Sequence, residues 1–308
     1  MIRFVLKRSL STIIMLLGVS TITFLLIHLV PGDPAHAILR ENAQIQDVEN
    51  LRRKMGLNLP LSVQYKNFIL GIFKRNMGKS LITGKNVSDE IKDHFPATLE
   101  LALGSLLISI IISLPFGVLS AYKEGSIIDH VSTGFSIFGL AIPNFWLGPL
   151  LIILFSIKLR LFPVSGRDGL LSLILPATTL GTYFSAFLMR ITKVSILEEL
   201  NENWVRTARA KGLKESQVMI KHVLRNSLIP IVTILGLQAG SLLTGAIITE
   251  TIFSWPGIGS LLIKSITRRD YPMVQGVVLF ISFLYIFINF LTDILYSIID
   301  PRIRVKGV

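Results

Sequence analysis

The chain has 308 residues, of which 51% are hydrophobic and only 16% are charged, and its mean hydropathy is +0.64. Soluble domains carry about 25% charged residues, so an ordinary soluble protein is excluded. The net charge of +12 fits either nucleic-acid binding or a Lys- and Arg-rich membrane surface, and the long apolar blocks favour the membrane. The absence of cysteine excludes disulfides, thiolate metal sites and cysteine nucleophiles, and the five histidines do not have metal-ligand spacing.

The first apolar run follows three cationic residues and extends from Leu10 to Val30. A signal peptide has an apolar region of about 7–15 residues and a small-residue cleavage site. This run is longer and leads into Pro31, Gly32 and Asp33. We therefore expect an uncleaved first helix.

The apolar blocks predict an all-α membrane protein with six transmembrane helices. About 20 apolar residues cross the hydrocarbon layer as a helix, and the backbone there must satisfy its own hydrogen bonds. Proline at positions 115, 143 and 149 is expected to kink the second and third helices. The expected spans are Leu10–Val30, Thr98–Tyr122, Gly134–Ile157, Leu170–Met189, Leu228–Thr249 and Gly276–Ile299.

The distribution of Lys and Arg predicts the orientation of these helices. The two termini and the short loops on their side hold fifteen such residues, against six in the short loops on the other side. Because cytoplasmic loops are enriched in Lys and Arg, both termini should be cytoplasmic. The segment 31–97 has ten cations and seven acids, and long loops translocate largely regardless of charge, so we place it outside. Short helices are expected within it at Asp47–Met55 and Leu61–Phe73, separated by Gly56 and Pro60.

The segment Asn201–Pro230 is too polar for lipid and too apolar for a solvated tail. Apolar and small residues recur at helical spacing through its first half and predict a short helix with one apolar face. Gly212 should end this helix, and a second helix is expected at about 216–226. Two short helices with a cationic, small-residue face suit docking to a soluble partner. A basic helix resting on anionic lipid is the alternative. The residues that would form the docking face are Trp204, Arg206, Thr207, Ala208, Gly212 and Leu213.

At this segment the sequence resembles the EAA loop of binding-protein-dependent ABC importer permeases. Arg206–Leu213 reads RTARAKGL, as is typical of the dipeptide, oligopeptide and nickel branch of that family, with Arg206 in place of the first Glu of the motif. The resemblance covers nearly the whole chain. Its further motifs are Pro31–Pro34, Phe95–Glu100, Ile142–Trp146, Leu175–Ala177, Thr249–Gly259, Arg269–Pro272 and Asp300–Arg304.

The resemblance implies the type I ABC importer permease fold in the cytoplasmic (inner) membrane, and a set of partners. These partners are a second homologous permease, two ABC ATPase subunits that use ATP and Mg, and an extracytoplasmic substrate-binding protein; no nucleic acid is implied. The chain contains no GxxxxGK[ST] phosphate loop, so we expect a transport subunit that binds no cofactor or metal and is not itself an enzyme. The expected organisation is 1–93 for the first helix and long outer segment, 94–299 for the core with coupling loop 190–227, and 300–308 for a cytoplasmic tail.

Two further features have a functional and a structural interpretation. The segment after the fifth span contains Pro and Gly and suggests a broken turn, which would be an external gate, a contact for the binding protein, or simply a helix cap. Asp293 in the sixth span is either a functional intramembrane charge or a side chain that reaches toward Arg302. The residues of the broken turn are Glu250, Phe253, Trp255, Pro256, Gly257 and Gly259.

The expected function is import of short peptides, with nickel or a nickel chelate as the alternative because that sister group shares nearly all of these motifs. A stand-alone channel or secondary transporter would predict paired intramembrane charges and inverted repeats, which the sequence does not show. A membrane-embedded enzyme would need a cluster of His, Asp or Ser within the spans, and Asp293 alone is insufficient.

Overall fold

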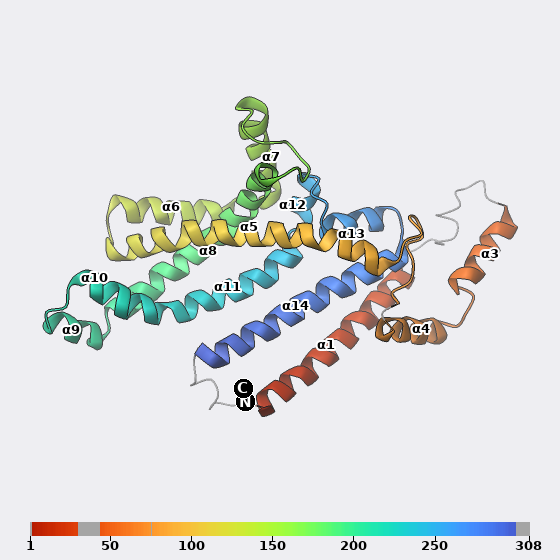
Figure 1. Cartoon of the computed structure of the whole chain (residues 1–308), viewed down its shortest axis with the longest axis horizontal. Coiled ribbons are helices and arrows are strands. Elements are labelled where there is room, and N and C mark those ends of the chain that lie inside the picture. Colours follow the sequence, from red (N-terminus) through yellow and green to blue (C-terminus); the bar gives the residue numbers. More distant parts are fainter. Residues whose placement is uncertain (1, 30–43, 75, 300–308) are drawn as a thin grey trace. The chain divides into compact units, whose positions relative to one another are not determined.

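The computed structural model describes residues 2–29, 44–74 and 76–299, with the exception of some side chains within those ranges, Asp293 among them. The motifs at 31–34 and 300–304 and the tail 300–308 lie outside this part of the chain. The described part is helical, and its β pairing is one antiparallel bridge between Lys79 and Asn86 (Figure 1). The elements are α1 (Ile2–Leu29), α3 (Ile45–Met55), α4 (Leu61–Phe73), α5 (Val87–Tyr122), α6 (Ile127–Ala141), α7 (Asn144–Leu151), the π-helical η1 (Ile152–Lys158), α8 (Leu170–Leu200), α9 (Asn203–Ala210), α10 (Glu215–Gln217), the π-helical η2 (Val218–Leu224), α11 (Arg225–Gly245), α12 (Ile247–Ile252), α13 (Ile258–Thr267) and α14 (Tyr271–Ile299).

Several of these helices are long and apolar enough to cross a membrane. Four such stretches are described: α5, α8, α14 and the continuous run Glu215–Leu242 through α10, η2 and α11. The pair α6 and α7–η1 adds a fifth if it forms one broken span. In α1 the described apolar stretch Ser9–Leu25 is shorter. The described residues thus show four to five candidate spans where the sequence predicts six.

The third expected span, 134–157, differs from the prediction because it is two helices rather than one kinked helix. α6 ends at Ala141 and α7 begins at Asn144. Together α6 and the run α7–η1 are long and apolar enough to cross a membrane, but the two are bent by 106° at the break between them. Pro143 explains the break, since it lacks an amide proton and disfavours the helical conformation of the residue before it. Ile142 accordingly has the extended angles φ −83° and ψ 117°.

The chain divides into two compact units that are discontinuous in sequence, and α5 and α14 contribute residues to both. Of the described residues, unit 1 holds 99–255 and 288–299, and its central helix is α8, on which α6, α7 and α11 pack. Small residues allow close contact: a Cβ added to Gly181 would lie 2.9 Å from Ile108, and one added to Gly139 would lie 2.7 Å from Ala186. Small residues at helix interfaces are the usual way in which transmembrane helices approach each other.

Unit 2 holds residues 2–98 and 256–287. The two short helices expected in the outer segment are present as α3 and α4, and Gly56 ends α3 in the left-handed conformation with φ +70°. α4 packs on α1 through Phe24, whose ring centroid lies 5.2 Å from that of Tyr65 and 5.7 Å from that of Phe68. Residues 45–55 and 61–73 of the outer segment are therefore helical, as the sequence predicts.

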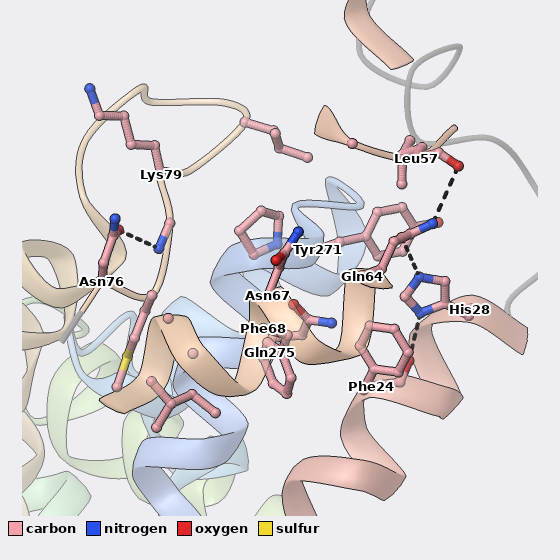
Figure 2. Close-up of a pocket in the computed structure, with 18 of the residues that line it drawn as sticks. Phe24, His28, Leu57, Gln64, Asn67, Phe68, Asn76, Lys79, Tyr271 and Gln275 are labelled. Atoms are coloured by element: carbon pink, nitrogen blue, oxygen red, sulfur yellow. Dashed lines mark hydrogen bonds between the residues drawn. The ribbon is translucent and has the colours of Figure 1, made fainter. Parts of the chain in front are cut away.

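The start of α14 packs on the loop after α4 and on the start of α5. Asp270 precedes this helix, is buried, accepts a hydrogen bond from the Ser80 hydroxyl, and accepts another from the amide of Leu81 at 3.1 Å. An added Cβ at Gly276 would lie 2.3 Å from Val87, so α14 and α5 approach closely here. A cavity remains among α1, α4, the loop after α4 and the start of α14 (Figure 2).

Candidate coupling site

The helix α9 and the turn after it form the centre of the motif that the sequence singles out. α9 ends at Ala210, and the next turn has the hydrogen bonds of a Schellman motif: Gly212 N donates to Arg209 O at 3.0 Å, and Leu213 N donates to Ala208 O at 3.4 Å. Gly212 has φ +77°, in the left-handed region that favours glycine. The prediction that Gly212 ends this helix is confirmed, and the turn sends the chain directly into α10.

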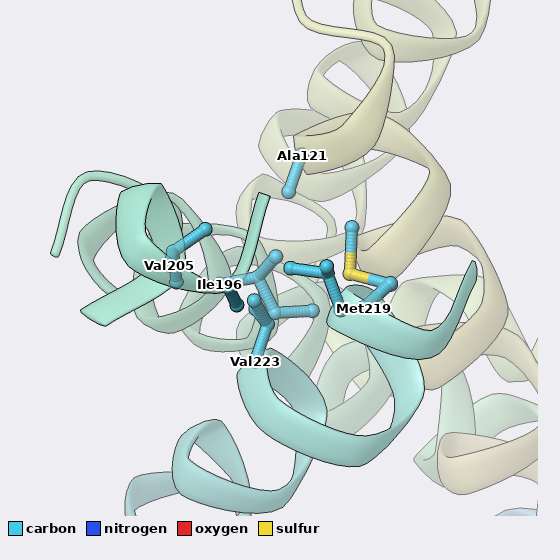
Figure 3. Close-up of a cluster of buried hydrophobic side chains, with 7 residues drawn as sticks. Ala121, Ile196, Val205, Met219 and Val223 are labelled. Carbon is cyan, nitrogen blue, oxygen red and sulfur yellow. The ribbon is translucent and has the colours of Figure 1, made fainter. Parts of the chain in front are cut away.

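One face of α9 is buried inside unit 1. Val205 is fully buried and Ala208 is 7% exposed, and both belong to a hydrophobic cluster, here called the coupling cluster. Figure 3 shows side chains from α5, α8, α9 and η2 converging there. Trp204 packs at its edge, with its ring centroid 6.1 Å from that of His222. The buried members of the coupling cluster are Ala121, Ile196, Val205, Ala208, Val218, Met219 and Val223.

The opposite face of α9 is exposed. Arg206, Thr207, Gly212 and Leu213 all lie at the surface of the chain. The small side chain of Ala208 therefore allows close approach within this chain, and an outside partner would meet the exposed residues instead. The sequence pattern correctly placed Trp204, Val205 and Ala208 on a short helix, whereas Gly212 lies in the turn after it. Periodicity does not say whether an apolar stripe packs on its own chain or on a partner.

An ion pair spans the turn between α9 and α10. Arg209 donates two hydrogen bonds to Glu215, Nε to Oε2 at 3.1 Å and Nη2 to Oε1 at 2.6 Å. These hydrogen bonds hold the pKa of Glu215 below its ordinary value and raise the pKa of Arg209. Further cationic side chains are exposed along this part of the chain, on α9, in the turn after it, on η2 and at the start of α11. They are Arg206, Lys211, Lys214, Lys221 and Arg225.

A second polar network, which the sequence analysis missed, joins the helices beneath the coupling cluster. Asp129 near the start of α6 is buried and accepts hydrogen bonds from Ser120 Oγ, from the Gly125 amide at 3.0 Å and from Lys193 Nζ on α8. Ser120 adjoins Ala121, and Lys193 precedes Ile196 by about one helical turn, so the network directly adjoins the coupling cluster. An Asp and a Lys placed 64 residues apart give no local signal that they pair.

The broken turn after the fifth span is present, and most of it is packed inside the chain. Glu250 and Trp255 are fully buried and Phe253 is 2% exposed, while Pro256 is half-buried. In unit 1 the Phe253 carbonyl accepts a hydrogen bond from the Gly166 amide at 2.9 Å, and Trp255 N donates to Glu250 O at 2.8 Å.

In unit 2 the other two glycines of the broken turn, Gly257 and Gly259, are buried at the start of α13. The amide of Ile258 between them donates to Thr98 Oγ1 at 2.8 Å. The segment is thus a helix–turn–helix with buried anchors, and the exposed side chain of Ser254 lies at its bend.

Comparison with known families identifies the class of protein. The family model described as "Binding-protein-dependent transport system inner membrane component" matches residues 113–305, and the model of the N-terminal region of such membrane components matches residues 1–102. The chain belongs to this family. It is a permease subunit of a binding-protein-dependent ABC importer and a multi-pass inner-membrane protein.

Several relatives match along the full length. The chain is 40% identical over 338 residues to the dipeptide transport system permease protein DppB of Escherichia coli (strain K12), which covers 99% of this chain and 100% of the relative. It is 43% identical over 333 residues to the di/tripeptide transport system permease protein DppB of Pseudomonas aeruginosa (strain UCBPP-PA14), at 99% coverage of both. It is 40% identical over 306 residues to the glutathione transport system permease protein GsiC of Escherichia coli (strain K12), covering 99% of this chain and 100% of the relative.

Solved structures show the same fold. An amino acid ABC transporter superimposes with a TM-score of 0.56 at 16% identity, covering 68% of this chain and 94% of that one. The MetNI methionine ABC transporter in an inward-facing conformation gives a TM-score of 0.53 at 18% identity, covering 68% and 96%. The type I importer permease fold expected from the motifs is therefore confirmed for the part of the chain that these structures cover.

Proposed function

We propose that this chain is the channel-forming subunit of an ATP-driven importer for short peptides, and that partner ATPases drive its alternating access. The observation that carries the proposal is that α9 is buried against unit 1 on one face and exposed on the other. Its exposed face is cationic and free to meet a soluble partner, while Val205 and Ala208 fix its other face to α5, α8 and η2. A displacement of α9 therefore moves membrane helices with it, because packed side chains transmit motion as rigid bodies.

The proposed importer needs further subunits to supply ATP hydrolysis, the rest of the pathway and the delivery of substrate. We assign ATP and Mg to two ATPase subunits that dock on the face containing Arg206, Thr207, Gly212 and Leu213. A second homologous permease completes the pathway, and an extracytoplasmic binding protein delivers the substrate. The proposed topology has six spans with both termini cytoplasmic, so that α9 faces the ATPases and the segment 31–97 faces the binding protein.

The substrate class is proposed from the relatives. Three of them are named for dipeptides, di- and tripeptides, and glutathione, all of which are short peptides. This favours short peptides over nickel, the alternative that the motifs leave open. In the buried broken turn, we propose that Glu250, Phe253 and Trp255 help to close the outer side of the pathway.

Reconstitution tests the proposal. The chain is placed in proteoliposomes with its partner permease, ATPases and binding protein, and uptake of the dipeptide Ala-Phe and of Ni²⁺ is measured with and without ATP. We expect ATP-dependent uptake of Ala-Phe and none of Ni²⁺, and no ATP hydrolysis by this chain alone. Uptake of Ni²⁺ instead of peptide would contradict the substrate assignment, and hydrolysis by the isolated chain would contradict the division of labour.

A further inference from the structure

Unit 2 contains a cavity of about 930 Å³ that the coupling site does not use. It lies among α1, α4, the loop after α4 and the start of α14 (Figure 2). Pockets that bind small molecules usually measure about 300–1,000 Å³. Under the proposed topology, this cavity is on the outer side of the membrane.

Three polar groups in the cavity have no hydrogen-bond partner among the described residues. They are the carboxamides of Asn67 on α4 and Gln275 on α14, and the buried hydroxyl of Tyr271. Figure 2 shows both carboxamides turned into the cavity. Other lining groups are satisfied, since His28 Nε2 lies 3.1 Å from Gln64 Oε1, and Gln64 Nε2 donates to Leu59 O at 2.8 Å. The Tyr271 hydroxyl is buried, whereas the residue Asn67 is exposed and Gln275 is half-buried. Because buried polar groups normally have partners, the unpaired Tyr271 hydroxyl indicates a ligand, and the two solvent-accessible carboxamides beside it can bind that ligand.

The rest of the lining restricts the chemistry of that ligand. The lining has no Asp or Glu, and its two cationic residues are Arg52 and Lys79. Arg52 lies 3.6 Å from Glu49, outside the lining, so Lys79 is the cation that favours a ligand group with negative charge. Phe24, Phe68 and Leu279 supply apolar surface. A carboxamide offers both a donor and an acceptor, as does a peptide group, so two free carboxamides match a ligand with amide bonds.

We infer that this cavity is a holding site for a short peptide between its release by the binding protein and its passage into the membrane. Asn67 and Gln275 pair with the N–H and C=O groups of the peptide, and the aromatic wall takes a side chain. Lys79 attracts the peptide carboxylate. The inference rests on the proposed function and adds a defined site outside the membrane pathway.

The first experiment measures binding directly in the complete membrane complex without the binding protein. Because the chain has no cysteine, Met77, which lines the cavity, is replaced by a single cysteine, Met77→Cys. Labelling of this position by a maleimide is followed by mass spectrometry while Ala-Phe is added. We expect Ala-Phe to slow labelling, and Asn67→Leu together with Gln275→Leu to raise the half-protecting concentration by about tenfold or more, the effect of losing hydrogen bonds worth roughly 1 kcal/mol each.

A second variant keeps the shape of the side chain. Gln275→Glu introduces a carboxylate that repels the carboxylate of Ala-Phe, so we expect it to weaken protection by Ala-Phe more than protection by its C-terminal amide. Asn50→Leu on the exposed surface of α3 is the matched control and should change neither. In transport with the binding protein, the cavity variants should raise KM for Ala-Phe and leave the maximal rate near that of the wild type.

The outcomes separate this inference from the proposed function. If the wild-type complex imports Ala-Phe but the peptide protects nothing and the variants keep the wild-type KM, the holding site is wrong and the importer stands. If the wild-type complex imports no peptide, the proposed function is wrong, and the protection assay still decides whether the cavity binds peptide. Equal protection by Ala-Phe in the wild type and the double variant would also overturn the inference.

Discussion

At the residue scale, the geometry around α9 depends on one backbone conformation and one ion pair. Gly212 reverses the chain with φ +77°, and an added Cβ would meet nothing within 4 Å. The need for glycine is therefore conformational rather than a matter of space. The pair Arg209–Glu215 then joins the two sides of that turn.

We expect Gly212→Ala to destabilise the coupling site by about 1 kcal/mol, because the left-handed conformation costs an L-residue roughly 1–2 kcal/mol. Gly212→Asn should cost less, since Asn tolerates this conformation better. Gly134→Ala is the control: this glycine lies within helix α6 and also has open space around it, so alanine there should be neutral or stabilising. Thermal unfolding of the purified protein checks the order, and equal midpoints for Gly212→Ala and the wild type would contradict it.

The Arg209–Glu215 pair predicts a pH dependence. The pKa of Glu215 is lowered in the folded state, so its contribution is present above the unfolded pKa and is lost as the pH falls through the folded pKa. We expect the wild type to exceed Glu215→Gln in stability by at most about 1 kcal/mol near neutral pH, because the pair is partly exposed. This difference should shrink below about pH 4.5. Unfolding midpoints of both proteins across pH test this, with Glu198→Gln as a matched control; a difference that grows in acid would refute it.

At the element scale, the coupling cluster is fixed to the membrane helices by the network around Asp129. The carboxylate of Asp129 holds the turn between α5 and α6 through Ser120 and Gly125, and it pairs with Lys193 of α8. The side chains of Asp129 and Lys193 are only 10% and 23% exposed. The Asp129 network thus connects α5, α6 and α8 next to the coupling cluster.

Removing one partner of this pair should be worse than removing both. Lys193→Met leaves the buried carboxylate of Asp129 without its counter-charge, which costs at most about 3–5 kcal/mol because Ser120 and Gly125 still donate to it. The double variant with Asp129→Asn should recover part of that loss, since the amide still accepts from Ser120. Membrane abundance and peptide-stimulated ATPase activity of the complex measure the effect, with Lys123→Met at an exposed position as the control. Additive losses in the double variant would show that the two side chains act independently.

A large side chain on the exposed face of α9 should interfere with docking of the ATPases. Thr207→Trp adds a large ring to this face at a position where the helix needs no special backbone angle, unlike Gly212, so folding and docking are separated. Overpacking a fitted contact costs about 1–3 kcal/mol, or roughly 5- to 150-fold in assembly. Co-purification of the ATPases should fall while membrane abundance stays normal. Ile220→Trp, on an exposed position of η2 outside that face, is the matched variant and should assemble normally. Normal assembly of Thr207→Trp would remove α9 from the ATPase contact.

At the scale of the whole molecule, the topology decides which partner each element meets. The proposal places the segment 31–97 outside and the coupling loop 190–227 inside. Single cysteines introduced as Asn50→Cys and Lys211→Cys, both at exposed positions, test it in this cysteine-free chain. In intact cells an impermeant thiol reagent should label position 50 and spare position 211 until the membrane is opened. Labelling of position 211 from outside would overturn the proposed orientation.

The sequence by itself determined the features that depend on local or one-dimensional signals. Apolar run length predicted four of the helices that are long and apolar enough to cross a membrane, and glycine and proline predicted where α3 and α9 end and where α4 begins. The motif at Arg206–Leu213 indicated the family that the comparisons then confirmed. These signals need no knowledge of contacts, since helix propensity, turn conformation and hydropathy act within a few residues.

Only the tertiary structure decided which side chains meet. It turned Ala208 and Val205 inward, buried Glu250 and Trp255, and paired Asp129 with Lys193 across 64 residues. It also bent the third expected span by 106° and left a cavity with unpaired carboxamides in unit 2. A periodic pattern shows that a helix has an apolar face, but which surface covers that face depends on the packing of distant segments, and the packing also fixes the cost of each buried polar group.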